Sequence, residues 1–161
     1  MSAVDKNEAM LAYMCTCPQI AESPLYFNFV NAKAEDKQFV TNTSDKRINK
    51  GFIDGSVLKR YSFTIMDYRS VAYQAVVKQE GYPNENVEEV LDIQGIIDWI
   101  DEQNDNRNFP DFGEYCQIDE IRTTSENPNL NSVNTQVSPA LAKYSITIQV
   151  DYIDTSKKIF S

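Results

Sequence analysis

The 161-residue sequence contains no histidine and only three cysteines, Cys15, Cys17 and Cys116. Without histidine the chain lacks the commonest general base, metal ligand and pH switch, and Ser-His-Asp and Cys-His mechanisms are excluded within one chain. Three cysteines without Cys-x-x-Cys spacing argue against a disulfide framework and against a zinc site. Cys116 falls in a predicted strand, where we expect a buried free thiol.

Glycine is also scarce, and its five copies are scattered singly, so the P-loop and dinucleotide-binding fingerprints are both absent. Neighbouring carboxylates do not form a catalytic pair either. Glu88 and Glu89 fall in a predicted helix, where adjacent side chains point about 100° apart. Asp119 and Glu120 fall in a predicted strand and should face opposite sides. We therefore expect no enzymatic activity and no cofactor or metal.

Long apolar runs and basic residues are missing as well. No window approaches the roughly 20 apolar residues of a membrane helix, and the N-terminus lacks a basic-then-apolar signal pattern. The chain carries 15 basic and 24 acidic residues, a formal net charge of −9. Neutralising phosphates requires clustered Lys and Arg, so stable nucleic-acid binding is not expected. These features predict a protein made and used in a cytosol-like compartment, or exported by lysis or assembly, without a membrane partner.

An alternating segment near the C-terminus, 144–152, is the clearest positive signal. Its apolar residues Tyr144, Ile146, Ile148, Val150 and Tyr152 alternate with polar ones. Successive side chains of a strand point to opposite faces, so the pattern predicts a strand with one apolar and one polar face. Such a strand must lie on a sheet formed by earlier residues.

Three earlier segments supply that sheet and a helix to cover it. Residues 59–68 alternate, with Tyr61, Phe63 and Ile65 on one face. Residues 86–103 have a broad apolar face at helical spacing, and Asn86 followed by Glu89 resembles a capping box. Residues 115–124 form a third predicted strand. The order strand-helix-strand-strand predicts an α+β fold: one domain over 1–161 with a mostly antiparallel mixed sheet.

The remaining segments are predicted more coarsely. Residues 3–14 have the pattern of a short N-terminal helix that packs on the sheet, and Pro18 and Pro24 mark a linker. Residues 25–30 and 37–43 are rich in aromatic and β-branched side chains and predict strands. Residues 44–56 predict a polar, locally basic loop, 67–84 a long connection, and 126–139 a polar loop between two antiparallel neighbours. We expect a flexible C-terminal tail near 154–161.

This pattern resembles phage tail terminator proteins, also called tail completion or minor tail proteins, which occur in phage-tail-like particles too. The resemblance rests on the segments 59–66, 86–103, 115–122 and 142–152, and on the N-terminal helix and strands that precede them. It covers most of the chain at the level of element order, with no catalytic motif. The stretch 67–84 is longer than compact family members have.

The resemblance implies a structural virion protein that forms a homo-oligomeric ring, usually a hexamer. Such a ring caps the head-proximal end of the tail tube, stops its polymerisation and joins it to the head connector or neck protein. It implies contact with the tail tube protein and, in a contractile tail, with the sheath. The protein would then reside in the virion tail after assembly in the host bacterial cytoplasm, with DNA passing through the ring without stable binding.

Ring closure requires a head-to-tail interface with two different patches on each subunit. The candidate interface residues come from the basic loop, from the polar loop long enough to reach a neighbour, and from two arginines of the predicted strands. They are Lys46, Arg47, Lys50, Arg60, Arg122, Asn127, Asn129 and Asn131. A basic patch that also includes Lys59 could pair with acidic helix residues of the neighbour. Two alternatives remain open: a head-tail connector or neck protein, and a non-phage cytosolic α+β interaction module.

Overall fold

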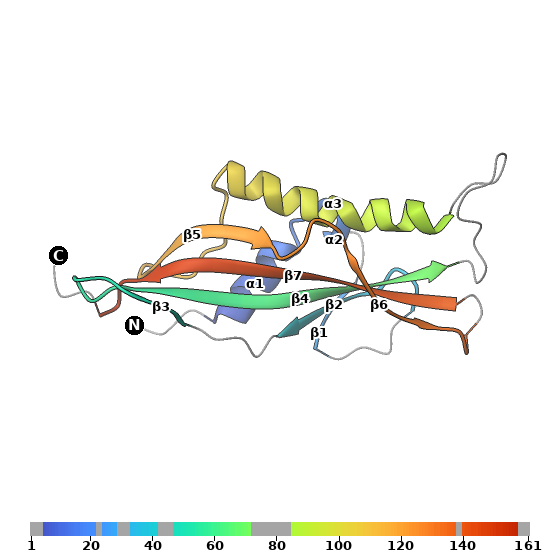
Figure 1. The fold of residues 1–161 in the computed structure, drawn as a ribbon, viewed down its shortest axis with the longest axis horizontal. Helices are drawn as coiled ribbons and strands as arrows, with labels where there is room; N and C mark the ends of the chain where they lie inside the picture. Colours follow the sequence, from blue (N-terminus) through green and yellow to red (C-terminus); the bar gives the residue numbers. More distant parts are fainter. Residues whose placement is uncertain are drawn as a thin grey trace.

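A computed structural model gives the fold (Figure 1), and it describes residues 5–21, 24–28, 33–41, 47–71, 85–137 and 140–157, with the backbone alone at 47–50 and 85–89. The elements in chain order are α1 (Lys6–Met14), α2 (Pro18–Ala21), β1 (Leu25–Phe27), β2 (Lys37–Thr41), β3 (Arg47–Gly51), β4 (Val57–Val71), α3 (Glu85–Asp105), β5 (Cys116–Thr123), β6 (Asn129–Asn134) and β7 (Ala140–Asp154).

Two long antiparallel strands, β4 and β7, form the spine of the sheet (Figure 1). Each has 15 residues, and their register is unbroken from the Val57–Asp154 pair to the Val71–Ala140 pair. The strand order is β1-β2-β4-β7-β5, with β3 pairing to β4 and β6 pairing to β7. Among the strand pairs formed by the described residues, the β1–β2 pair alone is parallel. The predicted α+β class, with a mostly antiparallel mixed sheet, is confirmed.

The alternation predicted for the last strand is confirmed residue by residue. Along β7 the even-numbered side chains from Ala140 to Tyr152 are buried, and those between them are mostly half-exposed. Their partners on β4 include Phe63 and Ile65, both fully buried. This apolar face packs under the buried side of α3, which contributes Ile93, Ile96, Ile97 and Ile100. Burying such side chains is worth about 1.5–3 kcal/mol each, which is why the helix stays on the sheet.

The N-terminal helix packs into the same core, as predicted. Asp5 caps it, because its Oδ1 accepts hydrogen bonds from the backbone N–H groups of Asn7 and Glu8 at 2.9 and 3.4 Å. Met10 and Met14 are fully buried, and the hydroxyl of Tyr13 donates to the carbonyl of Asn108 beyond the end of α3. The three helices and the apolar sheet face therefore share a single hydrophobic core.

Several predicted boundaries are wrong. The main helix begins at Glu85 and ends at Asp105, so Asn86 lies inside it and is not its cap. Pro18 does not mark a linker but begins α2, because proline is well accommodated in a first helical turn. β4 continues to Val71, through the start of the predicted connection 67–84, and residues 72–84 lie outside the described ranges.

Both predicted polar loops contain a strand. The loop 44–56 includes β3, which pairs with the first residues of β4, and the loop 126–139 includes β6, which pairs with the first half of β7. The predicted tail near 154–161 starts too early: Asp154 ends β7, and the backbone N–H of Thr155 donates to Tyr115 at 2.8 Å. Residues 158–161 lie outside the described ranges.

Gly95 permits a close approach of α3 to α2. A Cβ atom at this position would lie 2.5 Å from Nε2 of Gln19. We predict that Gly95→Ala stabilises the protein by about 1 kcal/mol in a Gln19→Ala background, because alanine is the better helix former and the obstacle is gone. In the wild-type background the gain should shrink, because the Gln19 side chain must move. Urea unfolding of the four variants measures this coupling, and equal gains in both backgrounds would contradict it.

Candidate interaction surfaces

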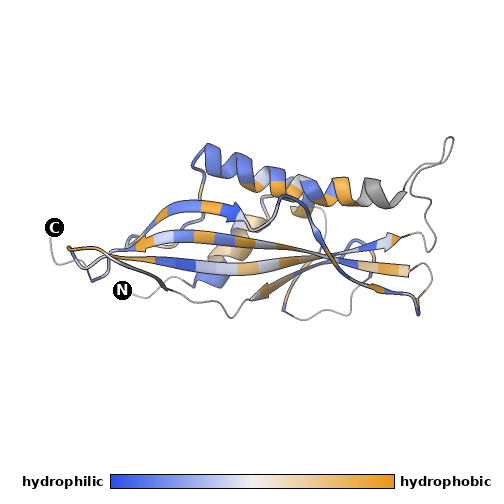
Figure 2. Cartoon of the chain, viewed as in Figure 1, coloured by the Kyte–Doolittle hydropathy of each residue, from blue (hydrophilic) through white to orange (hydrophobic). Residues whose placement is uncertain are grey.

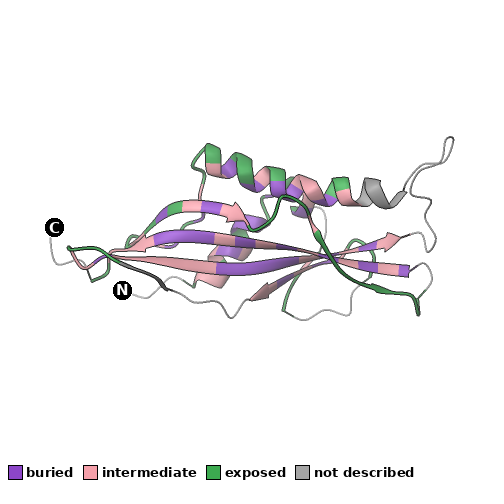
Figure 3. Cartoon of the chain, viewed as in Figure 1, coloured by how far each residue is buried: buried purple, intermediate pink, exposed green. Residues whose placement is uncertain are grey.

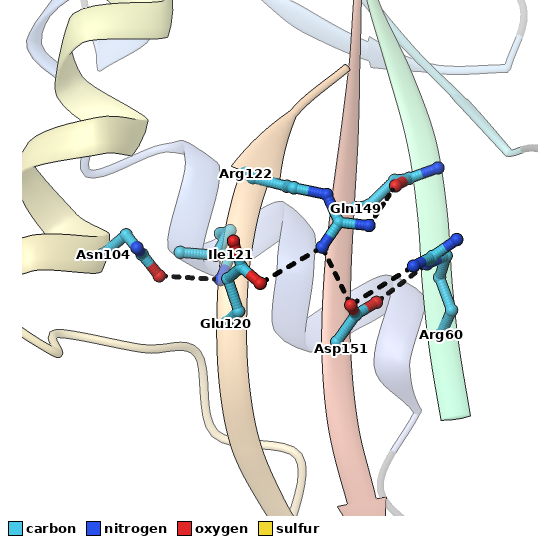
Figure 4. A network of polar contacts seen from close by, with 7 residues as sticks. All are labelled: Arg60, Asn104, Glu120, Ile121, Arg122, Gln149 and Asp151. Atoms are coloured by element: carbon cyan, nitrogen blue, oxygen red, sulfur yellow. Dashed lines mark hydrogen bonds and ion pairs between the residues drawn. The ribbon is translucent and has the colours of Figure 1, made fainter. Parts of the chain in front are cut away.

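A polar network lies on the sheet face opposite to the helices. Figure 4 shows it in front of the strands, with α1 behind them. Arg60 on β4 binds both carboxylate oxygens of Asp151 on β7, at 2.8 and 3.3 Å. Arg122 on β5 reaches Asp151 at 2.8 Å, Gln149 at 2.8 Å and Glu120 at 3.3 Å. Three strands are thus joined by charged side chains on this face, which we call the open face.

The charges of this network are balanced locally. Burial alone would raise the pKa of Asp151, but the hydrogen bonds from Arg60 and Arg122 outweigh it and hold the pKa below its ordinary value. Further along the same face Ser62 and Thr64 are buried, and Thr64 and Thr147 share a hydrogen bond of 3.1 Å. The open face is therefore polar, and the buried polar side-chain atoms described on it form hydrogen bonds with one another. The exception is the buried Ser62 Oγ, for which the described part of the chain supplies no hydrogen-bond partner.

A second ionic cluster lies on the helix side, at the other end of β4. Asp67 is 1% exposed and binds Arg69 Nε at 2.8 Å and Lys37 Nζ at 3.6 Å. Arg69 extends to Asp92 on α3 at 2.5 Å, and the Asp92 side chain is 58% exposed. Burial, the largest influence, raises the pKa of Asp67, and the two cations oppose that rise. This cluster ties β2, β4 and α3 together, and it resembles a structural ion-pair network more than a reactive site.

An acidic groove of about 490 Å³ runs between α3 and the segment that joins β5 to β6. Asp98 and Asp101 line it from the helix and Glu126 from the joining segment. Burial raises the pKa of Asp101, and repulsion from Asp98, Asp105 and Glu126 raises it further. Like charges that are held together in this way favour a cationic partner. Sequence reasoning missed the groove, because its two walls are almost thirty residues apart in the chain.

Large apolar side chains are exposed at both ends of the molecule (Figures 2 and 3). At the β3–β4 turn Ile53 is 95% exposed and Phe52 is 40% exposed. At the far end β6 is exposed along its whole length, and it carries Leu130 and Val133, with Val137 just beyond it. In the sequence, the first site is marked by two adjacent apolar residues before an Asp-Gly turn, within a loop that is otherwise polar.

The predicted interface residues are distributed over several places. Arg60 and Arg122 meet on the open face, where both bind Asp151. Arg47 and Lys50 belong to β3 at one end of the spine, with only their backbone described, and Lys46 lies outside the described residues. Lys59, which we grouped with Arg60, pairs instead with Asp154.

The three asparagines lie at or just before β6, and all are exposed. Asn131 accepts a hydrogen bond from Ser145 Oγ at 2.8 Å, and Asn129 Nδ2 donates to Asn131 at 3.0 Å. The carbonyl of Asn127 accepts from Ser125 Oγ at 2.8 Å. The structure thus brings these three together, far along the sheet from β3.

The described residues offer little to a catalytic mechanism. They hold no group of three or more Cys, Asp or Glu side chains arranged to bind a metal ion. Burial raises the pKa of both the Cys17 and Cys116 thiols, which makes them poor nucleophiles. None of the helices seen in these parts of the chain has the length and apolar character needed to cross a membrane.

Comparison with known proteins adds no assignment. No protein-family model matches this chain, and no curated protein matches it in sequence.

Proposed function

We propose that this protein is a structural subunit of a phage tail or phage-tail-like particle, of the tail terminator type. Its copies form a closed ring, expected to be a hexamer, at the head-proximal end of the tail tube. The ring ends tube polymerisation and provides the surface that meets the head connector, with the sheath as an added neighbour in a contractile tail. The site of action is the virion tail, and no chemistry is required of the subunit.

The observation that carries this proposal is the element order from β4 to β7. The strand-helix-strand-strand series expected from the resemblance is the series in the structure, with β6 added between the last two strands. The surfaces also support the proposal, because the helices cover one sheet face, the other face is mostly polar, and apolar side chains are exposed at both ends. An enzyme would instead need convergent reactive groups.

The charge of the chain suits a ring that surrounds passing DNA. A formal net charge of −9 repels phosphates, so DNA can move through without being held. On the open face each guanidinium is engaged by a carboxylate, which leaves little positive potential for phosphate binding. A lumen lined by uncompensated Lys and Arg in an assembled ring would contradict this part of the proposal.

The test is the oligomeric state of the purified protein with and without the tail tube protein of the same particle. We expect light scattering to give about six times the subunit mass, and negative-stain images to show rings that limit tube length. A strict monomer in both conditions, with tubes of unchanged length, would overturn the proposal. Tubes of normal length in a strain without the protein, together with heads that lose DNA, would assign it to the connector class instead.

A further inference from the structure

The β3–β4 turn is a rigid apolar projection at one end of the molecule (Figure 1). Its backbone is closed by hydrogen bonds from the N–H of Phe52 to Ser56 and from the N–H of Gly55 to Phe52, at 2.9 and 3.1 Å. Asp54 Oδ1 accepts from both the N–H and the hydroxyl of Ser56, and Gly55 adopts a φ of 91° that favours glycine. Such a turn holds the exposed Ile53 in place, as an anchor residue requires.

The opposite end of the molecule offers a matching surface. β6 pairs with β7 along one edge, and in the part of the chain that the structure describes its other edge pairs with no strand. The register places Leu130 opposite Tyr144 and Val133 opposite Ala142, which puts both on the helix side of the sheet. They are nevertheless 51% and 43% exposed. We call Leu130, Val133 and Val137 the β6 patch.

Charge is also complementary between the segment before the apolar turn and the acidic groove that precedes β6. Lys46, Arg47 and Lys50 precede the apolar turn within a few residues. Asp98, Asp101 and Glu126 line the acidic groove, and its joining segment leads directly into β6. Burial and then repulsion from nearby carboxylates raise the pKa of Asp101, and cations of a neighbouring copy would reduce that repulsion. The turn on one side and the β6 patch with the groove before it on the other are therefore two different surfaces of opposite charge, which is what a head-to-tail contact requires.

We propose that the β3–β4 turn of one copy docks on the β6 patch of the next, with Ile53 against Leu130 and Val133. Strand β3, whose sequence includes Arg47 and Lys50, then lies beside the neighbour's acidic groove. This inference rests on the proposed ring and names the surfaces that close it. Because the turn and the patch lie at opposite ends, each copy uses both at once, and the contact propagates until the ring closes.

Cysteine cross-linking tests the contact directly. In a Cys15→Ser background, which removes the exposed native thiol, the double variant Ile53→Cys/Val133→Cys should give a ladder of linked species up to the full ring on mild oxidation. Either single variant alone should give no ladder. Dimers from Ile53→Cys alone would indicate a symmetric contact and overturn the proposal, as would an unlinked double variant that still forms rings. A wild-type protein without rings would instead refute the proposed function.

A charge exchange tests the polar half of the contact. Glu126→Lys should weaken self-association at least tenfold, and adding Lys50→Glu should restore most of it. Tyr26→Ser is the matched control, since Tyr26 is 40% exposed on the edge strand β1, away from both ends, and it should leave association unchanged. Circular dichroism checks that each variant is folded. Failure of Lys50→Glu to rescue folded Glu126→Lys would overturn the assigned charge pairing.

Discussion

Replacing Arg69 with Met should lower the free energy of unfolding by about 3–5 kcal/mol. Arg69 donates two hydrogen bonds to Asp67, at 2.8 and 3.2 Å, and Asp67 is 1% exposed. Without the guanidinium, the described residues leave the buried carboxylate only the longer contact to Lys37. A buried charge that loses its closest partner costs far more than the pair itself contributes. Chemical denaturation at pH 7 measures the loss.

The loss should depend on pH in a defined direction. Burial raises the pKa of folded Asp67 above its value in the unfolded chain, about 3.9. A carboxyl of this kind contributes stability below the unfolded pKa, and that stability is lost as the pH rises through the folded pKa. Removing Arg69 raises the folded pKa further, since its hydrogen bonds lower it. The deficit of Arg69→Met should therefore shrink as the pH falls from 7 toward 4.

Two controls separate this cluster from ordinary ion pairs. Lys59→Met removes the partly exposed pair with Asp154, and it should cost about 1 kcal/mol or less. The triple variant Lys37→Met/Asp67→Leu/Arg69→Met replaces the buried charges with apolar groups and should regain most of the Arg69→Met loss. A loss below about 1 kcal/mol for Arg69→Met, matching Lys59→Met, would show that the buried cluster is as weakly coupled as a surface pair.

The spine of the fold was predictable because its signals are local. The alternation of residues 59–68 and 144–152 reflects one buried and one solvated face, and each segment shows this within its own sequence. The helix was predictable for the same reason, to within two residues at each end. The contact between the helix and the sheet was predictable from the apolar face of each element: the predicted apolar side of β7 does pack under α3.

Strands β3 and β6 were missed because their stability is not local. β6 reads Asn-Leu-Asn-Ser-Val-Asn, and asparagine is depleted in strands. It is a strand because β7 offers backbone partners, with a register shift between Leu130 and Ser132 that absorbs one residue. β3 is similarly polar and pairs with β4 through an irregular register. No composition rule detects a strand that is defined by its neighbour.

The candidate surfaces were harder still to predict. Arg60 and Arg122 were selected as interface residues, and the fold brings them onto the same aspartate. The sequence did not indicate that both arginines would bind Asp151, because this residue belongs to a third strand, β7. The ionic cluster at Asp67 was missed because its strand was interpreted as a connection from residue 67 onward. Surfaces of this kind depend on strand register, which a single sequence specifies only in part.

Truncating Phe63 to alanine should cost about 3–5 kcal/mol of unfolding free energy. The side chain is fully buried in the middle of β4, and its ring stacks on Phe39 with centroids 4.4 Å apart and planes 7° apart. Removal leaves a cavity between β2, β4 and the helices, and it also removes the ring contact. Since domains of this size are stable by about 5–15 kcal/mol, the variant should be close to unfolding at 37 °C.

Leu130→Ala is the informative comparison, because it also truncates a large apolar side chain on the helix side of the sheet. Leu130 is 51% exposed, so its loss should cost under about 1 kcal/mol in the isolated subunit. Both variants must be unfolded at a concentration where light scattering shows monomer, since assembly stabilises the folded state by mass action. A subunit that tolerates Leu130→Ala but then fails to assemble would separate the residues that hold the fold from those that serve the contact. Equal losses for the two variants would show instead that β6 belongs to the core and is not available to a neighbour.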